Sequence, residues 1–131
     1  MKENILKFGI IAIVILGSFF DCSDDSDEKI NVSIPTVGIT RIWDMTTTTA
    51  ICEAEVVSDG GGNIISRGFC FSIEYNPDLE DFTTNEGGGT GAFASQLNSL
   101  TPGTVYWVRA YVTNSKGTGY SSARGFSTRS N

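Results

Sequence analysis

The sequence predicts an all-β domain, a sandwich of two sheets with about seven strands. From Ile34 onward the apolar residues show no helical period, and short runs rich in β-branched and aromatic residues alternate with glycine-rich and polar clusters. The 131 residues include 15 glycines and 40% hydrophobic residues, which suits a turn-rich globular domain. A chain of this length has room for one such core and a short leader.

Turn residues separate the expected strands, which cover residues 34–39, 47–57, 64–72, 81–84, 91–97, 106–113 and 120–126. Pro35 favours an edge position for the first strand, because proline cannot donate a hydrogen bond to a neighbouring strand. In the second strand, Glu53 and Glu55 mark the outer face, so Cys52 is expected to point into the core. Trp43 falls in the turn between these strands, where it is expected to cap the core or to form an exposed loop contact.

The strand at 106–113 is the clearest in the sequence. Trp107, Arg109 and Tyr111 share one of its faces. Tyr106 enters the strand directly after Leu-Thr-Pro-Gly-Thr at 100–104. This arrangement fits a tyrosine corner, in which the phenol bonds to the backbone a few residues upstream.

Short motifs spread over about residues 34–128 resemble, in order, those of fibronectin type III-like domains in Bacteroidota surface lipoproteins. They are Thr48-Thr49-Ala50, Ser58-Asp59-Gly60-Gly61, Arg67-Gly68-Phe69-Cys70-Phe71-Ser72, Asn76-Pro77, Gly89-Thr90-Gly91-Ala92-Phe93, the 100–111 segment, Asn114-x-x-Gly117-x-Gly119-Tyr120 and Phe126-Ser127-Thr128. The resemblance implies a fibronectin type III/Ig-like sandwich over residues 34–131. It does not imply one function, because such sandwiches host many roles.

The residues before the sandwich are expected to be a signal peptide and a spacer. The uncharged, mostly apolar run from Phe8 to Phe20 is too short to cross a hydrocarbon core of about 30 Å. Cys22 and the Ser/Asp run after it resemble the mature start of a bacterial lipoprotein. This resemblance implies a signal peptide at 1–21, acylation of Cys22 and an acidic spacer at 22–33. An uncleaved anchor helix is the alternative.

The remaining cysteines, Cys52 and Cys70, form an even pair once Cys22 is acylated. Exported domains mature where thiols tend to pair. Arg67 would be costly to bury unpaired, which favours an outward Arg67 and therefore an inward Cys70. The resemblance places the second and third strands in opposite sheets, so the sequence predicts a Cys52–Cys70 disulfide across the core. Two buried free thiols are the alternative.

An inward Cys70 has a consequence for the surface, because its two neighbours would then point outward. The exposed sheet face would carry Phe69, Phe71, Trp107, Arg109 and Tyr111, with Arg67 beside them. An exposed aromatic patch marks a contact surface and suits a sugar or a protein partner. The alternative is that Phe69 and Phe71 fill the core, as large aromatic residues usually do.

Composition restricts the classes of function. The chain has no histidine, 15 acidic and 9 basic residues, and a net charge of −6, which disfavours imidazole catalysis and nucleic-acid binding. No cofactor or metal is expected. The sequence predicts a non-catalytic binding or adhesion module for a protein or glycan ligand, held at the outer membrane by acylated Cys22 on either its exterior or its periplasmic face. The alternative is a structural accessory subunit of an outer-membrane assembly of the nutrient-uptake type.

Overall fold

The computed structural model describes residues 31–131, of which Val32–Asn131 form one compact unit. This part consists of β5 (Thr36–Trp43), β6 (Ala50–Ser58), β7 (Ser66–Ser72), β8 (Phe82–Thr83), β9 (Ala92–Leu97), β10 (Val105–Thr113), β11 (Thr118–Tyr120) and β12 (Arg124–Ser127). The signal peptide expected at 1–21 and the acylation site Cys22 lie outside the described residues. Among the described residues, no helix is long and apolar enough to cross a membrane.

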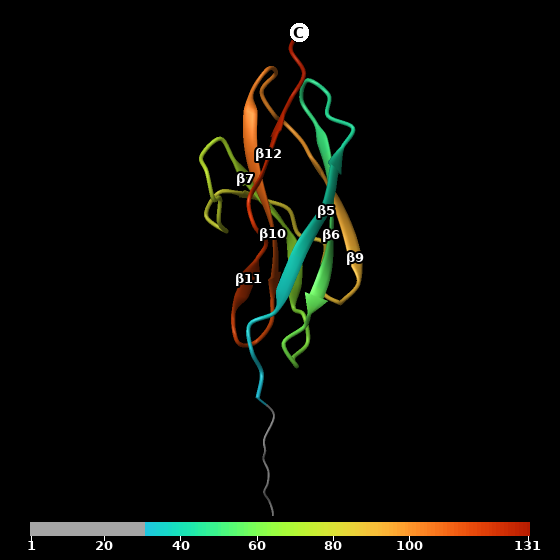
Figure 1. Ribbon diagram of the computed structural model, residues 1–131, viewed down its shortest axis with the longest axis vertical. Helices are drawn as coiled ribbons and strands as arrows, with labels where there is room; N and C mark the ends of the chain where they lie inside the picture. Colours follow the sequence, from blue (N-terminus) through green and yellow to red (C-terminus); the bar gives the residue numbers. More distant parts are fainter. Residues whose placement is uncertain (1–30) are drawn as a thin grey trace, which may run out of the picture. The chain divides into compact units, whose positions relative to one another are not determined.

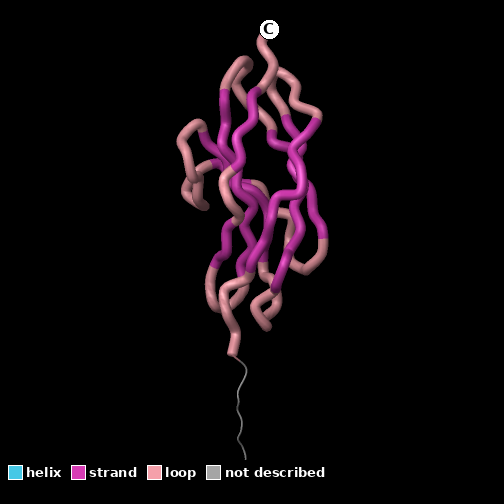
Figure 2. Tube along the Cα trace, in the orientation of Figure 1, coloured by secondary structure: helices cyan, strands magenta, loops and turns pink. Residues whose placement is uncertain are grey.

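The strands form two antiparallel sheets, which confirms the predicted two-sheet sandwich (Figures 1 and 2). One sheet has the order β5-β6-β9, and the other has the order β11-β10-β7-β8 with β12 also paired to β10. The last expected strand is divided into β11 and β12, which pair with different halves of β10. Ser121 lies at the division, where its Oγ accepts a hydrogen bond from Ala110 N at 2.9 Å.

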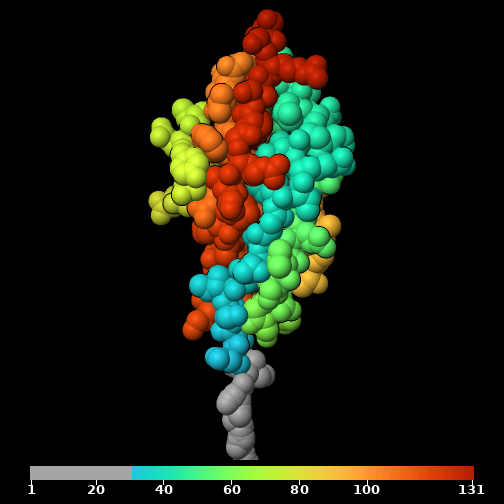
Figure 3. All heavy atoms as spheres, viewed as in Figure 1, coloured from blue at the N-terminus to red at the C-terminus, as the bar shows by residue number. Residues whose placement is uncertain are grey.

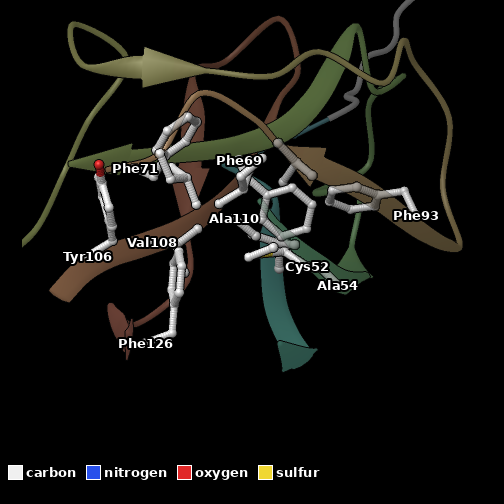
Figure 4. Close-up of a cluster of buried hydrophobic side chains, with 14 of the residues drawn as sticks. Cys52, Ala54, Phe69, Phe71, Phe93, Tyr106, Val108, Ala110 and Phe126 are labelled. Atoms are coloured by element: carbon white, nitrogen blue, oxygen red, sulfur yellow. The ribbon is translucent and has the colours of Figure 1, made fainter. Parts of the chain in front are cut away.

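The core lies between the inner faces of the two sheets (Figure 4). In β9 every second residue is buried, and Phe93 and Leu97 point inward as the alternation of a strand requires. The facing sheet contributes Phe69 and Phe71 of β7 and Tyr106, Val108, Ala110 and Val112 of β10. Aromatic contacts cross this space, with the rings of Phe69 and Phe93 5.3 Å apart.

Tyr106 lies at the start of β10 and belongs to the core (Figure 4). Its hydroxyl accepts a hydrogen bond from the backbone N–H of Thr101 at 2.8 Å. This is the contact that a tyrosine corner makes, and it ties the 98–104 connection to the strand that follows it.

The predicted orientation of β7 is wrong. Phe69 is 0% and Phe71 7% exposed, and both belong to the core. Arg67 shares their side of the strand, where its Nε is buried without a hydrogen-bond partner among residues 31–131 but its Nη1 is bound. Its Nη1 donates to Gly89 O at 3.0 Å and to Thr90 O at 2.8 Å, and the group lies 5.2 Å from the centre of the Phe93 ring. The glycine-rich loop therefore binds one end of the guanidinium, which allows Arg67 to point inward with only part of its hydrogen-bonding capacity satisfied.

The predicted disulfide is also wrong, for the same reason. Cys52 belongs to the core, whereas Cys70 lies on the opposite face of its sheet, paired across from Arg109. Both cysteines are buried and free. Burial raises the pKa of Cys52 to about 12 and that of Cys70 to about 11, so both thiols stay protonated near neutral pH.

Candidate functional site

The outer face of the β7–β10–β11 sheet brings together three of the predicted site residues. Trp107, Arg109 and Tyr111 occupy alternate positions of β10 on this face, with Cys70 of β7 beside Arg109. Phe69 and Phe71 do not take part, because they point into the core. The face is not an open aromatic platform, since residues 73–84 fold back across it. We call this segment the strap.

Hydrogen bonds from the face fix the strap at two points. Pro77 is fully buried, and its carbonyl oxygen accepts from Arg109 Nη1 at 3.2 Å and from the Cys70 thiol at 3.5 Å. Further along, the Tyr111 hydroxyl donates to Thr84 O at 2.6 Å. Burial raises the pKa of Tyr111, which keeps the phenol as a neutral donor.

Arg109 acts in this structure as a support for the strap. Besides holding Pro77 O, it donates from Nε to Ser121 O at 3.0 Å, and its guanidinium lies 4.3 Å from the centre of the Tyr120 ring. The hydrogen-bond donors of Arg109 are therefore occupied by the protein's own backbone. Tyr111 is 4% exposed, and its hydroxyl is likewise occupied by a backbone carbonyl group. Neither side chain is free to hold a ligand in this arrangement.

The open part of the face is an apolar corner made by Val105 and Trp107 of β10 and by Tyr75 of the strap, with the exposed Ile73 two residues before Tyr75 in the chain. Trp107 lies across β12 against Gly125, where a Cβ would meet the indole at 3.2 Å, so glycine makes room for the ring. Tyr75 contacts the same indole edge to face, with 4.9 Å between centroids and 85° between planes. Tyr75 is 65% and Ile73 62% exposed, and Val105 is also exposed.

The strap projects from the flank of the sandwich, as its yellow-green atoms show in Figure 3. Leu79 and Phe82 are exposed on it, Phe82 at 70% while stacking on Phe71. Acidic side chains hold its backbone: Asp81 Oδ2 accepts from Asp78 N at 2.9 Å, and Asp78 Oδ1 accepts from Glu80 N at 2.8 Å. The strap thus presents apolar side chains on a fixed backbone.

Sequence reasoning missed the strap, because it treated 76–78 only as a turn before a short strand. A signal was present in the sequence. Ile73, Tyr75, Leu79 and Phe82 are four large apolar residues in a region where turn chemistry predicts a polar loop. The two-residue β8 then returns the chain to the edge of β7.

Trp43 does not cap the core. It is the last residue of β5 and lies on the outer face of the other sheet, beside Arg41 and Glu53. Arg41 donates from Nε and Nη2 to the two Glu53 oxygens, each at 3.1 Å, and Trp43 Nε1 donates to Glu53 Oε2 at 3.0 Å. The bond from Arg41 lowers the pKa of Glu53. Each of these polar groups has a partner in the cluster, which fits a role in β5–β6 pairing.

Hollows on the described surface are shallow. One of about 270 Å³ is lined by Thr40, Glu53, Ala92, Phe93 and Ala94, and one of about 210 Å³ lies between β5 and the Ser121–Arg124 segment. Both fall below the roughly 300–1,000 Å³ that is usual for small-molecule sites. Among residues 31–131, no three Cys, Asp or Glu side chains converge as a metal site.

No family model and no characterised protein matches the sequence. Solved structures do match the fold. The sensor domain of the anti-sigma factor RsgI4 from Pseudobacteroides cellulosolvens has a TM-score of 0.54 at 17% identity, covering 76% of this chain and 99% of its own. The third fibronectin type III domain of the human KIAA0343 protein has a TM-score of 0.54 at 21% identity, covering 84% and 95%. A computationally redesigned β-sandwich protein has a TM-score of 0.50 at 21% identity, covering 76% and 97%. The chain therefore has a fibronectin type III-like fold.

Proposed function

We propose that this chain is a non-catalytic binding module of the cell envelope, anchored by acylated Cys22, which holds a protein ligand through the apolar corner and the strap. The observation that carries the proposal is the set of large apolar side chains exposed on a backbone that is fixed from below. Exposed apolar patches on small domains are typical of contact surfaces. Fixed aromatic side chains bind with a small entropic cost.

The ring geometry favours a protein over a glycan ligand. A sugar ring stacks on the flat face of an aromatic side chain, and neighbouring rings serve it best when they form one platform. Tyr75 and Trp107 meet at 85°, so the two rings do not form such a platform. Their arrangement, with Val105 on the same face of β10 as Trp107, instead suits the irregular apolar side chains of a protein.

The alternative function is an accessory subunit of an outer-membrane assembly. The exposed apolar side chains of the corner and the strap support this alternative as well. The two functions differ in the partner, which is a foreign ligand in one and a neighbouring envelope protein in the other. Identification of a cross-linked partner separates them.

Cross-linking in cells of the species that carries this chain tests the binding function. With p-benzoylphenylalanine in place of Tyr75, we expect one discrete protein adduct after irradiation. The matched control places the same residue at Val57, which is 73% exposed on β6 of the other sheet. We expect Ile73→Ser to reduce the adduct at position 75. The absence of a discrete adduct there, or an equal pattern at position 57, would overturn the proposed surface.

The intact mass of the membrane-extracted protein tests the anchor separately. Lipidation predicts a chain that begins at Cys22 and carries acyl groups. A mass that retains Met1 and lacks acyl groups would rule out this anchor, while leaving the cross-linking result unaffected.

A further inference from the structure

We infer that the partner of the strap presents a basic surface, with Lys or Arg side chains placed around an apolar centre. This inference rests on the proposed function, because it assumes that the strap is a contact surface. It adds the chemistry of the partner.

Acidic and apolar side chains alternate along the exposed strap. The apolar ones are Ile73, Tyr75, Leu79 and Phe82, and the acidic ones are Glu74, Asp78, Glu80 and Asp81. All eight side chains are exposed. This ten-residue stretch holds four of the nine acidic residues in 31–131 and none of the six basic ones. The negative charge of the domain is therefore concentrated where its apolar surface is most open.

Within residues 31–131, the strap acids have no basic partner. Among the described residues, the ion pair is Arg41 with Glu53, on the other sheet. Arg109 lies beneath the strap and is bound to the carbonyl oxygens of Pro77 and Ser121, so it offsets only part of the charge. Glu74 and Glu80 accept no side-chain hydrogen bond from the described protein, and their carboxylates are available to a partner.

The free energy of binding to this surface depends on the charge of the partner. A neutral or acidic partner would reach the apolar side chains only by removing water from carboxylates that it could not pair, which is unfavourable. A basic partner would pair with them, and the opposite charges would also speed the encounter. Like charge on a wrong partner is repelled, so the acids contribute to selectivity as well.

The test uses the cross-linking protein with p-benzoylphenylalanine at position 75, in its native cells and in the membranes isolated from them. We make Glu74→Gln and Glu80→Gln in that background, singly and together, because both changes keep the shape of the side chain and break no hydrogen bond in the described protein. Glu55→Gln is the matched control, since Glu55 is also exposed and lies on the other sheet.

We expect each strap substitution to lower the adduct yield roughly twofold, the pair to lower it further, and Glu55→Gln to leave it unchanged. The yield in membranes should also fall as salt is raised. The partner peptide attached at position 75 should carry an excess of Lys and Arg.

Two negative results are distinguishable. A discrete adduct whose yield changes with neither the substitutions nor salt overturns the proposal of a basic partner and leaves the binding surface in place. A cross-linked peptide that is neutral or acidic has the same consequence. The absence of a discrete adduct in the unsubstituted background overturns the proposed surface itself.

Discussion

At the scale of single residues, two arginines of this sandwich are held by the backbone of distant segments, although Arg67 Nε is buried without a hydrogen-bond partner in the described part of the chain. Arg67 on β7 is held by carbonyl groups of the 86–91 loop, and Arg109 on β10 by the strap and by Ser121. Each arginine therefore connects a strand to a connection far along the chain. In β7 and β10 a charged residue therefore marks a long-range contact, whereas Glu53 and Glu55 in β6 mark the outer face, as predicted.

The Tyr106 hydroxyl gives a prediction at this scale. Tyr106→Phe removes the acceptor of the Thr101 N–H and leaves the ring in the core. We expect the free energy of unfolding to fall by about 1–2 kcal/mol, the usual effect of leaving a partly buried donor unpaired. Urea unfolding measures it, with Tyr75→Phe as the control because the hydroxyl of Tyr75 has no partner in the described protein. An equal change in the two variants would contradict the assigned role.

At the scale of elements, the sequence predicts a strand well when only one of its faces is buried. In β9 the buried positions alternate, and the expected strand at 91–97 differs from the observed Ala92–Leu97 by one residue. In β7 every residue from Gly68 to Ser72 is buried, because the core covers one face and the strap the other. Such a strand carries no alternation from which orientation could be predicted.

The candidate site was predicted in part for the same physical reason. The shared face of Trp107, Arg109 and Tyr111 follows from alternation within β10 and was expected. What covers that face depends on a fold-back of residues 73–84, and its bonds to Pro77 and Thr84 link groups up to 32 positions apart in the chain. Local patterns do not record such contacts. The predicted orientation of β7 therefore depends on the charge of Arg67 alone. The hydrogen-bond partners of Arg67, Gly89 and Thr90, lie 22 and 23 residues away in the chain.

The strap itself gives a prediction at the element scale. Arg109→Met removes the donors to Pro77 O and Ser121 O while keeping a long apolar side chain on the face. We expect backbone amides of residues 73–81 to exchange with deuterium about tenfold faster, with little change in β6 and β9. Hydrogen exchange with mass spectrometry measures this, and Arg129→Met on the exposed C-terminal segment is the control. Unchanged exchange in the strap would show that Arg109 does not hold it.

At the scale of the whole domain, the two ends of the described chain lie at opposite ends of the sandwich, and the strap lies on a flank (Figure 1). Val32 enters at one end and Asn131 leaves at the other. The strap lies in the half of the sandwich that is away from Val32, so a tether that joins the domain through its N-terminal end would leave the strap accessible. The proposed anchor and the proposed contact surface are therefore compatible within one small domain.

The stability of the whole domain at alkaline pH provides the last prediction. Burial raises the pKa of Cys52 from 9.0 to about 12 and that of Cys70 to about 11, and it also raises the pKa of Tyr111. An unfolded thiol ionises near pH 9 while the folded thiol keeps its proton. The unfolded chain then binds fewer protons, and the free energy of unfolding falls as pH rises.

Below pH 9 the thiols are protonated in both the folded and the unfolded chain, and the free energy of unfolding has its full value. This free energy falls above pH 9, as pH rises towards and through the folded pKa values of the two thiols. Between pH 9 and 11 we expect a loss of about 1.4 kcal/mol per pH unit for each thiol. Urea unfolding without reductant over this range measures the slope. The Cys52→Ala, Cys70→Ala double variant is the comparison, because it has lower stability at neutral pH but lacks the thiol contribution to the slope. A disulfide between Cys52 and Cys70 would remove that contribution too, so equal slopes in the two proteins would contradict two free buried thiols.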